Sequence, residues 1–203
     1  LWYTASIVCF AAVIMVSLLL LNPEIGFTTS IRYAVFNMSS IISSTGFSHV
    51  DYTQWSPFIW TIMLFAMLLG GCSGSTSGGI KTIRIMLLLK NTYYEFQRLI
   101  HPNAVIPVRF NGHVVNMQII NNVLAFIFMY VLVMGISVVV FAGTGLGFEE
   151  ALGTTFAALT NVGLSMGDIG IGDYSTLTDF AKWYMSFLML IGRLELFTVL
   201  IVL

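Results

Sequence analysis

The chain has 203 residues, of which 58% are hydrophobic and only 8% are charged, whereas an ordinary soluble domain carries about 25% charged residues. This composition excludes a typical soluble domain, and a net charge of −1 gives no basic surface for a nucleic-acid partner. We therefore expect an all-α membrane protein that is surrounded mostly by the lipid bilayer.

Four apolar runs approach or reach the roughly 20 residues that a membrane-spanning helix needs. They cover residues 1–21, 57–70, 119–141 and 180–203, and the second run is interrupted at its end. The chain starts and stops inside such runs, which suggests a piece of a larger protein. Five of the eight basic residues lie between the second and third runs: Lys81, Arg84, Lys90, Arg98 and Arg109. Because Lys and Arg in short loops mark the cytoplasmic side, residues 81–113 are predicted to be cytoplasmic.

Each half of the chain repeats the order span, short helix, polar turn, span. The short helices are predicted at 31–42 and 148–159, and aligning Gly46 with Gly163 places the two polar turns on each other. About 12 residues give roughly 18 Å of helix, which cannot cross a hydrocarbon core of about 30 Å, so each short helix must enter and turn back. Two crossings per unit predict parallel repeats, at 1–90 and 114–203 with a cytoplasmic connection at 91–113, that form half of a pseudo-four-fold, potassium-channel-like ring.

The two polar turns are the predicted selectivity filter. Irregular backbone at membrane depth survives only where it is buried in protein or lines water, and rings of backbone carbonyls can replace the hydration shell of a cation. The predicted filter residues are Ser44, Thr45, Gly46 and Phe47 in the first repeat and Asn161, Val162, Gly163 and Leu164 in the second. The carbonyls of Thr45, Gly46, Val162 and Gly163 are the expected ion ligands. The alternative is that both turns merely cap short helices, which two turns at matching positions make less probable than one would.

A glycine- and serine-rich run interrupts the second span and is predicted to be an intramembrane gating loop, because Gly, Ser and Thr disfavour a continuous helix. It consists of Gly70, Gly71, Cys72, Ser73, Gly74, Ser75, Thr76, Ser77, Gly78 and Gly79. Two enzyme interpretations of this run, a phosphate-binding loop and a nucleophile elbow, fail on the spacing of their residues, so no catalytic residue is expected.

Arg193 lies within the fourth apolar run, where a mid-span arginine costs about 2.5–3.5 kcal/mol on insertion scales. We expect its side chain to reach the gating loop, donate to the loop carbonyls and add a positive barrier beneath the filter. The alternative is a purely structural tie between helices.

Four segments together resemble the Trk/Ktr/HKT superfamily of potassium transporters, specifically the C-terminal half of a bacterial TrkH-type subunit. They read S-S-T-G-F from Ser43, G-G-C-S-G-S-T-S-G-G-I-K-T from Gly70, T-N-V-G-L-S from Thr160 and G-R-L-E-L-F-T-V-L from Gly192. The resemblance implies the third and fourth of four pore-loop repeats, with filter glycines Gly46 and Gly163, a gating loop at 70–79 and Arg193 helping to close the pore.

The same resemblance implies potassium as the transported ion, no bound cofactor and a multi-pass location in the bacterial inner membrane. It also implies two partners: a second copy of the subunit, forming a homodimer, and a cytosolic nucleotide-binding regulatory ring. The competing hypotheses are a sodium-permeable or ion-coupled symporter of the same architecture and a non-conducting membrane scaffold. In related plant proteins, sodium selectivity accompanies serine in place of a filter glycine, a change that neither repeat shows.

Overall fold

A computed structural model describes residues 2–21, 26–50, 52, 55–72, 74–75, 77–101, 106–110, 113–165 and 174–194. Within these residues the chain is helical apart from two pairs of two-residue strands. The elements, in chain order, are α1 (Trp2–Leu21), α2 (Phe27–Ile42), α3 (Pro57–Leu68), β1 (Leu69–Gly70), β2 (Ile80–Lys81), α4 (Thr82–Ile100), β3 (Arg109–Phe110), β4 (His113–Val114), α5 (Met117–Gly143), α6 (Phe148–Thr160), η3 (Tyr174–Thr176) and α7 (Asp179–Arg193).

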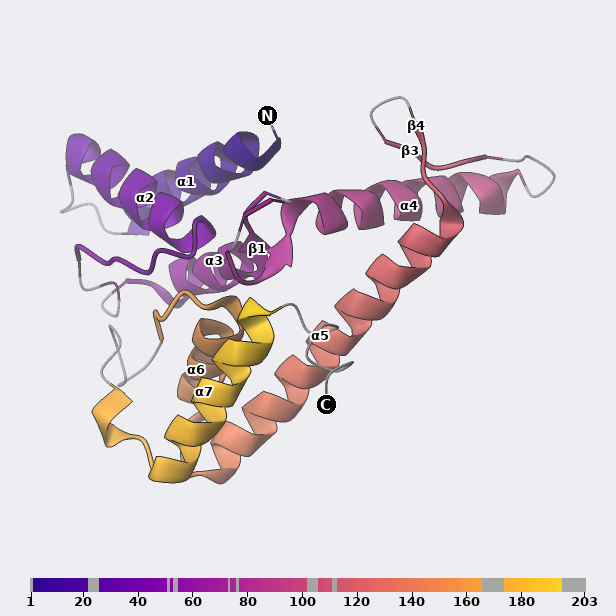
Figure 1. Cartoon of the computed structure of the whole chain (residues 1–203). Coiled ribbons are helices and arrows are strands. Elements are labelled where there is room, and N and C mark those ends of the chain that lie inside the picture. The colour runs from indigo at the N-terminus through magenta and orange to yellow at the C-terminus, as the bar shows by residue number, and fades with distance from the viewer. Residues whose placement is uncertain are drawn as a thin grey trace.

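Two three-helix units follow one another along the chain, as the sequence repeat predicts. Helices α1, α2 and α3 pack around one buried apolar cluster, and α5, α6 and α7 pack around a second. Figure 1 shows α1 beside α2 and α6 beside α7, with α3 on the side of the first unit that contacts α6. The first cluster also contains Phe156, Val162 and Leu164 from the second unit. The two units therefore share a packed interface next to the second polar turn.

Both short helices are present, with bounds that differ slightly from the predicted ones. Helix α2 begins at Phe27, four residues earlier than expected, and the carbonyl of its N-cap residue Gly26 accepts from the amides of Thr29 and Ser30 at 3.0 Å each. Helix α6 extends one residue further, to Thr160. The 16 residues of α2 span about 24 Å, which is still less than the hydrocarbon thickness of about 30 Å.

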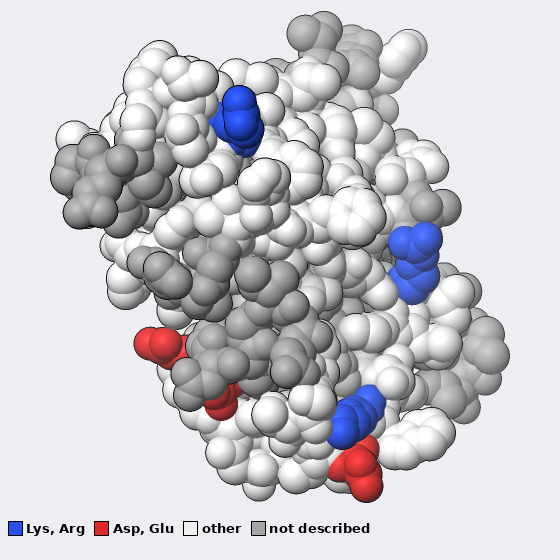
Figure 2. Space-filling model, turned by 90° about the vertical axis from the view of Figure 1, so that its left-hand side faces the viewer, with Lys and Arg blue, Asp and Glu red and all other residues white. Residues whose placement is uncertain are grey.

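Among the residues that the structure describes, two helices are long and apolar enough to cross a membrane, over residues Tyr3–Leu21 and Met117–Gly143. Large apolar side chains on α5 point outward, such as Phe128 and Val139, which are 67% and 72% exposed. Figure 2 shows a face on which charged side chains are few, with one basic and one acidic side chain next to each other near its lower edge. An apolar outer surface with a helical backbone is what lipid requires. The predicted second span is helical only to Leu68, and the fourth run is described only to residue 194.

Helix α4 was not predicted, and it carries the chain away from the two units (Figure 1). It continues without a break across the boundary between residues 90 and 91, where the sequence analysis placed the start of the cytoplasmic connection. Its buried residues, Leu87 and Asn91, lie on one side of a helix whose other residues are half-buried or exposed. In its last turns, Arg98 pairs with Glu95 and donates to the carbonyl of Ile106 at 2.7 Å. The segment between the repeats is thus an ordered helix followed by the hairpin β3–β4.

Candidate functional site

The first polar turn has a backbone that only a few residue types can adopt. Ser44 and Gly46 both have positive φ, +54° and +74°, a region in which glycine carries no steric cost. The carbonyl of Ser40 accepts hydrogen bonds from the amides of Thr45 at 2.9 Å and Gly46 at 3.4 Å. The hydroxyl of Ser40 donates to the carbonyl of Phe47 at 2.7 Å. One residue of α2 therefore holds the whole turn in shape.

The second polar turn repeats this backbone residue for residue. Asn161 and Gly163 have φ values of +55° and +83°, so they match Ser44 and Gly46 at the same offset. The amide of Gly163 donates to the carbonyl of Ala157 at 3.4 Å, again six residues back in the short helix. The alignment of Gly46 with Gly163 thus corresponds to a structural repeat.

The two turns lie directly against each other. A Cβ placed on Gly46 would stand 1.9 Å from the carbonyl oxygen of Val162, a separation that real atoms do not adopt. Gly46 is therefore required both for its positive φ and for this close approach. Val162 and Leu164 are buried, whereas Phe47 is 68% exposed. The second turn is packed into the protein while the first presents its side chains outward.

The predicted ion ligands fall into two groups. The carbonyls of Thr45, Gly46 and Val162 accept no hydrogen bond from any residue that the structure describes. The carbonyl of Gly163 accepts one from the hydroxyl of Tyr174 at 3.0 Å, which the sequence did not predict. Thr45 is exposed, Gly46 is half-buried and Val162 is buried. The first three carbonyl oxygens therefore have no donor among the described residues, and their role as ion ligands stays a prediction.

The electrostatics of both short helices favour positive charge at the turns. Helices α2 and α6 end at Ile42 and Thr160, immediately before the turns, and a helix C-terminus carries a partial negative charge of about 0.5. At the opposite end of α6, Glu149 and Glu150 occupy the first turn, and the Glu150 carboxylate accepts from the amide of Gly147 at 2.9 Å. Acidic residues there stabilise the helix by interacting with its positive end.

The predicted gating loop leaves and rejoins the membrane helices at one place. Strands β1 and β2 pair in parallel, so that Leu69 lies opposite Ile80. Within the loop, the amide of Gly71 donates to the Ser77 hydroxyl at 2.7 Å, and the Thr82 hydroxyl donates to the carbonyl of Gly70 at 2.9 Å. Ser73 and Thr76 lie outside the described residues. The two ends of the described loop therefore lie side by side and are joined by strand pairing and by side-chain hydrogen bonds.

The loop packs against the C-terminal end of α6, just below the second turn. A Cβ on Gly78 would lie 2.2 Å from the carbonyl oxygen of Thr160. On another side of the same helix end, a Cβ on Gly192 would lie 2.1 Å from the carbonyl oxygen of Leu159. The side-chain amide of Asn161 also donates to a carbonyl of α7 at 3.1 Å. The loop, α6 and α7 therefore meet at one tightly packed junction.

Arg193 does not make the predicted contact with the gating loop. Its side chain is exposed at the end of α7 and forms no hydrogen bond with the described loop residues. Successive residues of a helix point about 100° apart, and Gly192 is the residue that faces α6. Arg193 consequently points away from the contact that its neighbour Gly192 makes with the end of α6.

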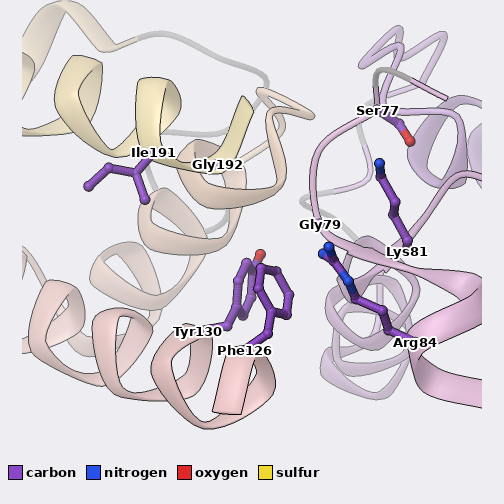
Figure 3. Close-up of a pocket in the computed structure, with 8 residues that line it drawn as sticks. All are labelled: Ser77, Gly79, Lys81, Arg84, Phe126, Tyr130, Ile191 and Gly192. Carbon is purple, nitrogen blue, oxygen red and sulfur yellow. The ribbon is translucent and has the colours of Figure 1, made fainter. Parts of the chain in front are cut away.

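Two other basic residues lie beside the loop instead. Figure 3 shows Lys81 and Arg84 extending from the start of α4 toward the loop and α5, and the Arg84 guanidinium stands 4.0 Å from the centre of the Phe126 ring. A small pocket at this position is lined by Ser77, Gly79, Lys81, Arg84, Phe126, Tyr130, Ile191 and Gly192. From the sequence, Lys81 and Arg84 were interpreted only as cytoplasmic charges. Their position shortly after Gly78 and Gly79 could have indicated that they lie beside the loop.

Comparison with known proteins agrees with this architecture. The family model for TrkH, described as a cation transport protein, matches residues 7–203. The Trk system potassium uptake protein TrkH of Halomonas elongata is 40% identical over 171 residues, covering 84% of this chain and 35% of that protein. The corresponding protein of Escherichia coli K12 is 34% identical, covering 85% of this chain and 35% of its own length.

The crystal structure of the potassium transporter TrkH from Vibrio parahaemolyticus superposes with a TM-score of 0.89 at 32% identity. That match covers 97% of this chain and 42% of the crystallised chain, and the chain spans about a third of the length of the curated relatives. The family is one of transporters and not of enzymes. With the helical membrane fold and both turns in view, the chain belongs to the TrkH family of cation transport proteins.

Proposed function

We propose that this chain supplies two of the filter segments of a potassium-conducting pore in a Trk-type uptake protein. The observation that carries the proposal is the pair of turns with positive φ at matching positions, in which the carbonyls of Thr45, Gly46 and Val162 have no hydrogen-bond donor among the described residues. Relatives named Trk system potassium uptake proteins support potassium as the ion.

Potassium selection follows from backbone oxygens and not from charged side chains. Carbonyl oxygens replace the water shell of the ion, and their number and spacing decide which cation is accepted. The partial negative charges at the ends of α2 and α6 compensate part of the dehydration cost. Gly163, whose carbonyl is bound by Tyr174, acts mainly by allowing the backbone to turn with positive φ.

The gating loop at residues 70–79 obstructs the path below the filter. Its contact with Thr160 through Gly78 supports this role, because movement of the loop away from α6 would open space under the second turn. Lys81 and Arg84 beside the loop add positive charge that opposes cation passage. Arg193, exposed at the end of α7 and without a hydrogen bond to the described loop residues, adds to this charge only at longer range. Family resemblance further supports a bacterial inner-membrane location, a homodimer and regulation by a cytosolic nucleotide-binding ring.

The test is uptake of rubidium-86 into proteoliposomes that contain the full-length parent protein, with potassium or sodium as competitor. Gly46→Ser introduces a side chain against Val162 at positive φ, so we expect it to weaken the preference for potassium over sodium. The matched control is Gly26→Ser, since Gly26 has an ordinary φ of −59° and open space around its Cβ position. We also expect Arg193→Ala to leak faster than wild type.

Each competing hypothesis gives a different result. Equal competition by sodium and potassium in the wild type would favour a sodium-permeable or ion-coupled symporter. Absence of rubidium uptake, or uptake unchanged by Gly46→Ser, would contradict the pore assignment and favour a membrane scaffold.

A further inference from the structure

We propose that Tyr52 is a positioning residue of the second filter turn, which it holds from the other repeat, and that this contact sets the turn's selectivity between cations. The inference rests on the proposed function, because it assigns a residue that controls the filter of that same pore. Tyr52 follows the first filter turn in sequence, yet its hydroxyl bonds to the second. Tyr52 therefore connects the two repeats at the level of the ion path.

The contact of Tyr52 is buried and well formed. Its side chain is 1% exposed, and its hydroxyl donates to the carbonyl of Ser165 at 2.8 Å across 113 residues of sequence. The indole N–H of Trp60 donates to the carbonyl of Tyr52 at 2.8 Å, which fixes the tyrosine to α3. A buried carbonyl that loses its donor is left without solvation, so this hydrogen bond resists displacement.

Ser165 is the point at which the backbone leaves the second filter turn. It lies two residues after Gly163 and is fully buried, and its hydroxyl stands 3.4 Å from that of Thr154 on α6. At the other end of the turn, the carbonyl of Val162 abuts Gly46 of the first repeat. The first repeat thus contacts the second turn at two places, through Gly46 and through Tyr52.

A second tyrosine supports the same turn from its own repeat. The offset that relates Met63 to Met185 also relates Tyr52 to Tyr174, and the Tyr174 hydroxyl donates to the carbonyl of Gly163 at 3.0 Å. The two matching tyrosines bind different partners: Tyr174 donates to a carbonyl of its own repeat, whereas Tyr52 donates to a carbonyl of the other repeat. The second turn is consequently held at two carbonyls that follow Val162, those of Gly163 and Ser165.

Bracing of this kind bears on selectivity more than on folding. A filter discriminates between cations of different size only if its carbonyls keep their number and spacing. Removing the Tyr52 hydroxyl leaves the aromatic ring in the core but frees the backbone at Ser165. The Val162 carbonyl could then approach a smaller cation more closely, so sodium should compete better while maximal rubidium uptake changes little.

The experiment compares Tyr52→Phe with wild type in the full-length parent protein, by rubidium-86 uptake in proteoliposomes at increasing sodium or potassium. We expect the ratio of the inhibitory sodium and potassium concentrations to fall about fivefold or more, the effect of one lost buried hydrogen bond. The matched control is Tyr184→Phe, which removes a hydroxyl 3.0 Å from Ser137 Oγ, away from the filter. The control should leave the ratio unchanged.

Gly46→Ser in the same assay distinguishes failure of the Tyr52 inference from failure of the proposed pore function. If Gly46→Ser changes the ratio and Tyr52→Phe does not, the inference is overturned while the proposed function stands. If neither changes it, the proposed function fails as well. Should Tyr52→Phe not fold, Trp60→Phe removes the anchor of Tyr52 and keeps its hydroxyl; a smaller fall in the ratio supports the inference, and an unchanged ratio refutes it.

Discussion

Replacing Gly78 by alanine should release the gating loop from α6. The new Cβ would stand 2.2 Å from the carbonyl oxygen and 2.6 Å from the carbonyl carbon of Thr160, whereas ordinary contact begins at 3.4 Å. The helix end cannot yield easily, because the Thr160 hydroxyl is bonded to the Phe156 carbonyl at 2.7 Å and Asn161 is tied to α7. The loop must therefore retreat by about 1 Å, since both groups it meets are backbone atoms.

Overpacking of this size costs roughly 1–3 kcal/mol. Because about 1.4 kcal/mol is a factor of ten in an equilibrium, the balance between closed and displaced loop should shift about 5- to 150-fold. We expect faster basal rubidium-86 uptake by full-length Gly78→Ala protein in proteoliposomes. Gly74→Ala is the matched control in the same loop, because nothing lies within 4 Å of its Cβ position. Equal uptake by the two variants would refute the closed-loop contact as a gate.

Three further substitutions test the packing around the site. Gly192→Ala places a Cβ 2.1 Å from the Leu159 carbonyl oxygen and should lower the melting temperature measured in detergent, whereas Gly135→Ala, with open space at its Cβ, should not lower it. Thr178→Ala removes the N-cap of α7 and should cost about 1 kcal/mol of stability in the same melting assay. Burial raises the pKa of Tyr174 from 10.0 to about 12, so the folded protein keeps this proton when the unfolded chain loses it. The difference in the free energy of unfolding between wild type and Tyr174→Phe should be constant below about pH 10. Between about pH 10 and 12 the wild type should lose stability relative to Tyr174→Phe, and no change in that window would contradict the burial of this hydroxyl.

The repeat and the backbone of its two polar turns could be predicted because glycine placement is a local backbone requirement, while their role as a filter stays a prediction. Aligning Gly46 with Gly163 was enough to match Ser44 with Asn161, and each matched pair has the same sign of φ. The gating loop was predicted for a similar reason, since a run of glycine and serine cannot extend α3. These features depend on what each residue can adopt by itself.

Features that depend on contacts between distant segments could not be predicted. Tyr52 and Ser165 are 113 residues apart, and neither position shows a pattern that names the other. Arg193 was expected at the loop on the basis of its charge, but the packing of Gly192 against α6 turns the arginine outward. Helix α4 was missed because its charged residues were interpreted only as markers of the cytoplasmic side, although Leu87 and Asn91 lie one turn apart on its buried face.

The most direct test of the central claim is the position of rubidium in a crystal structure of the full-length parent protein, located by its anomalous scattering. The account predicts a peak beside the two turns, coordinated by the backbone carbonyls of Thr45, Gly46 and Val162, which weakens in Gly46→Ser crystals. A pathway whose rubidium peaks are held by side chains elsewhere, with none at these carbonyls, would contradict it.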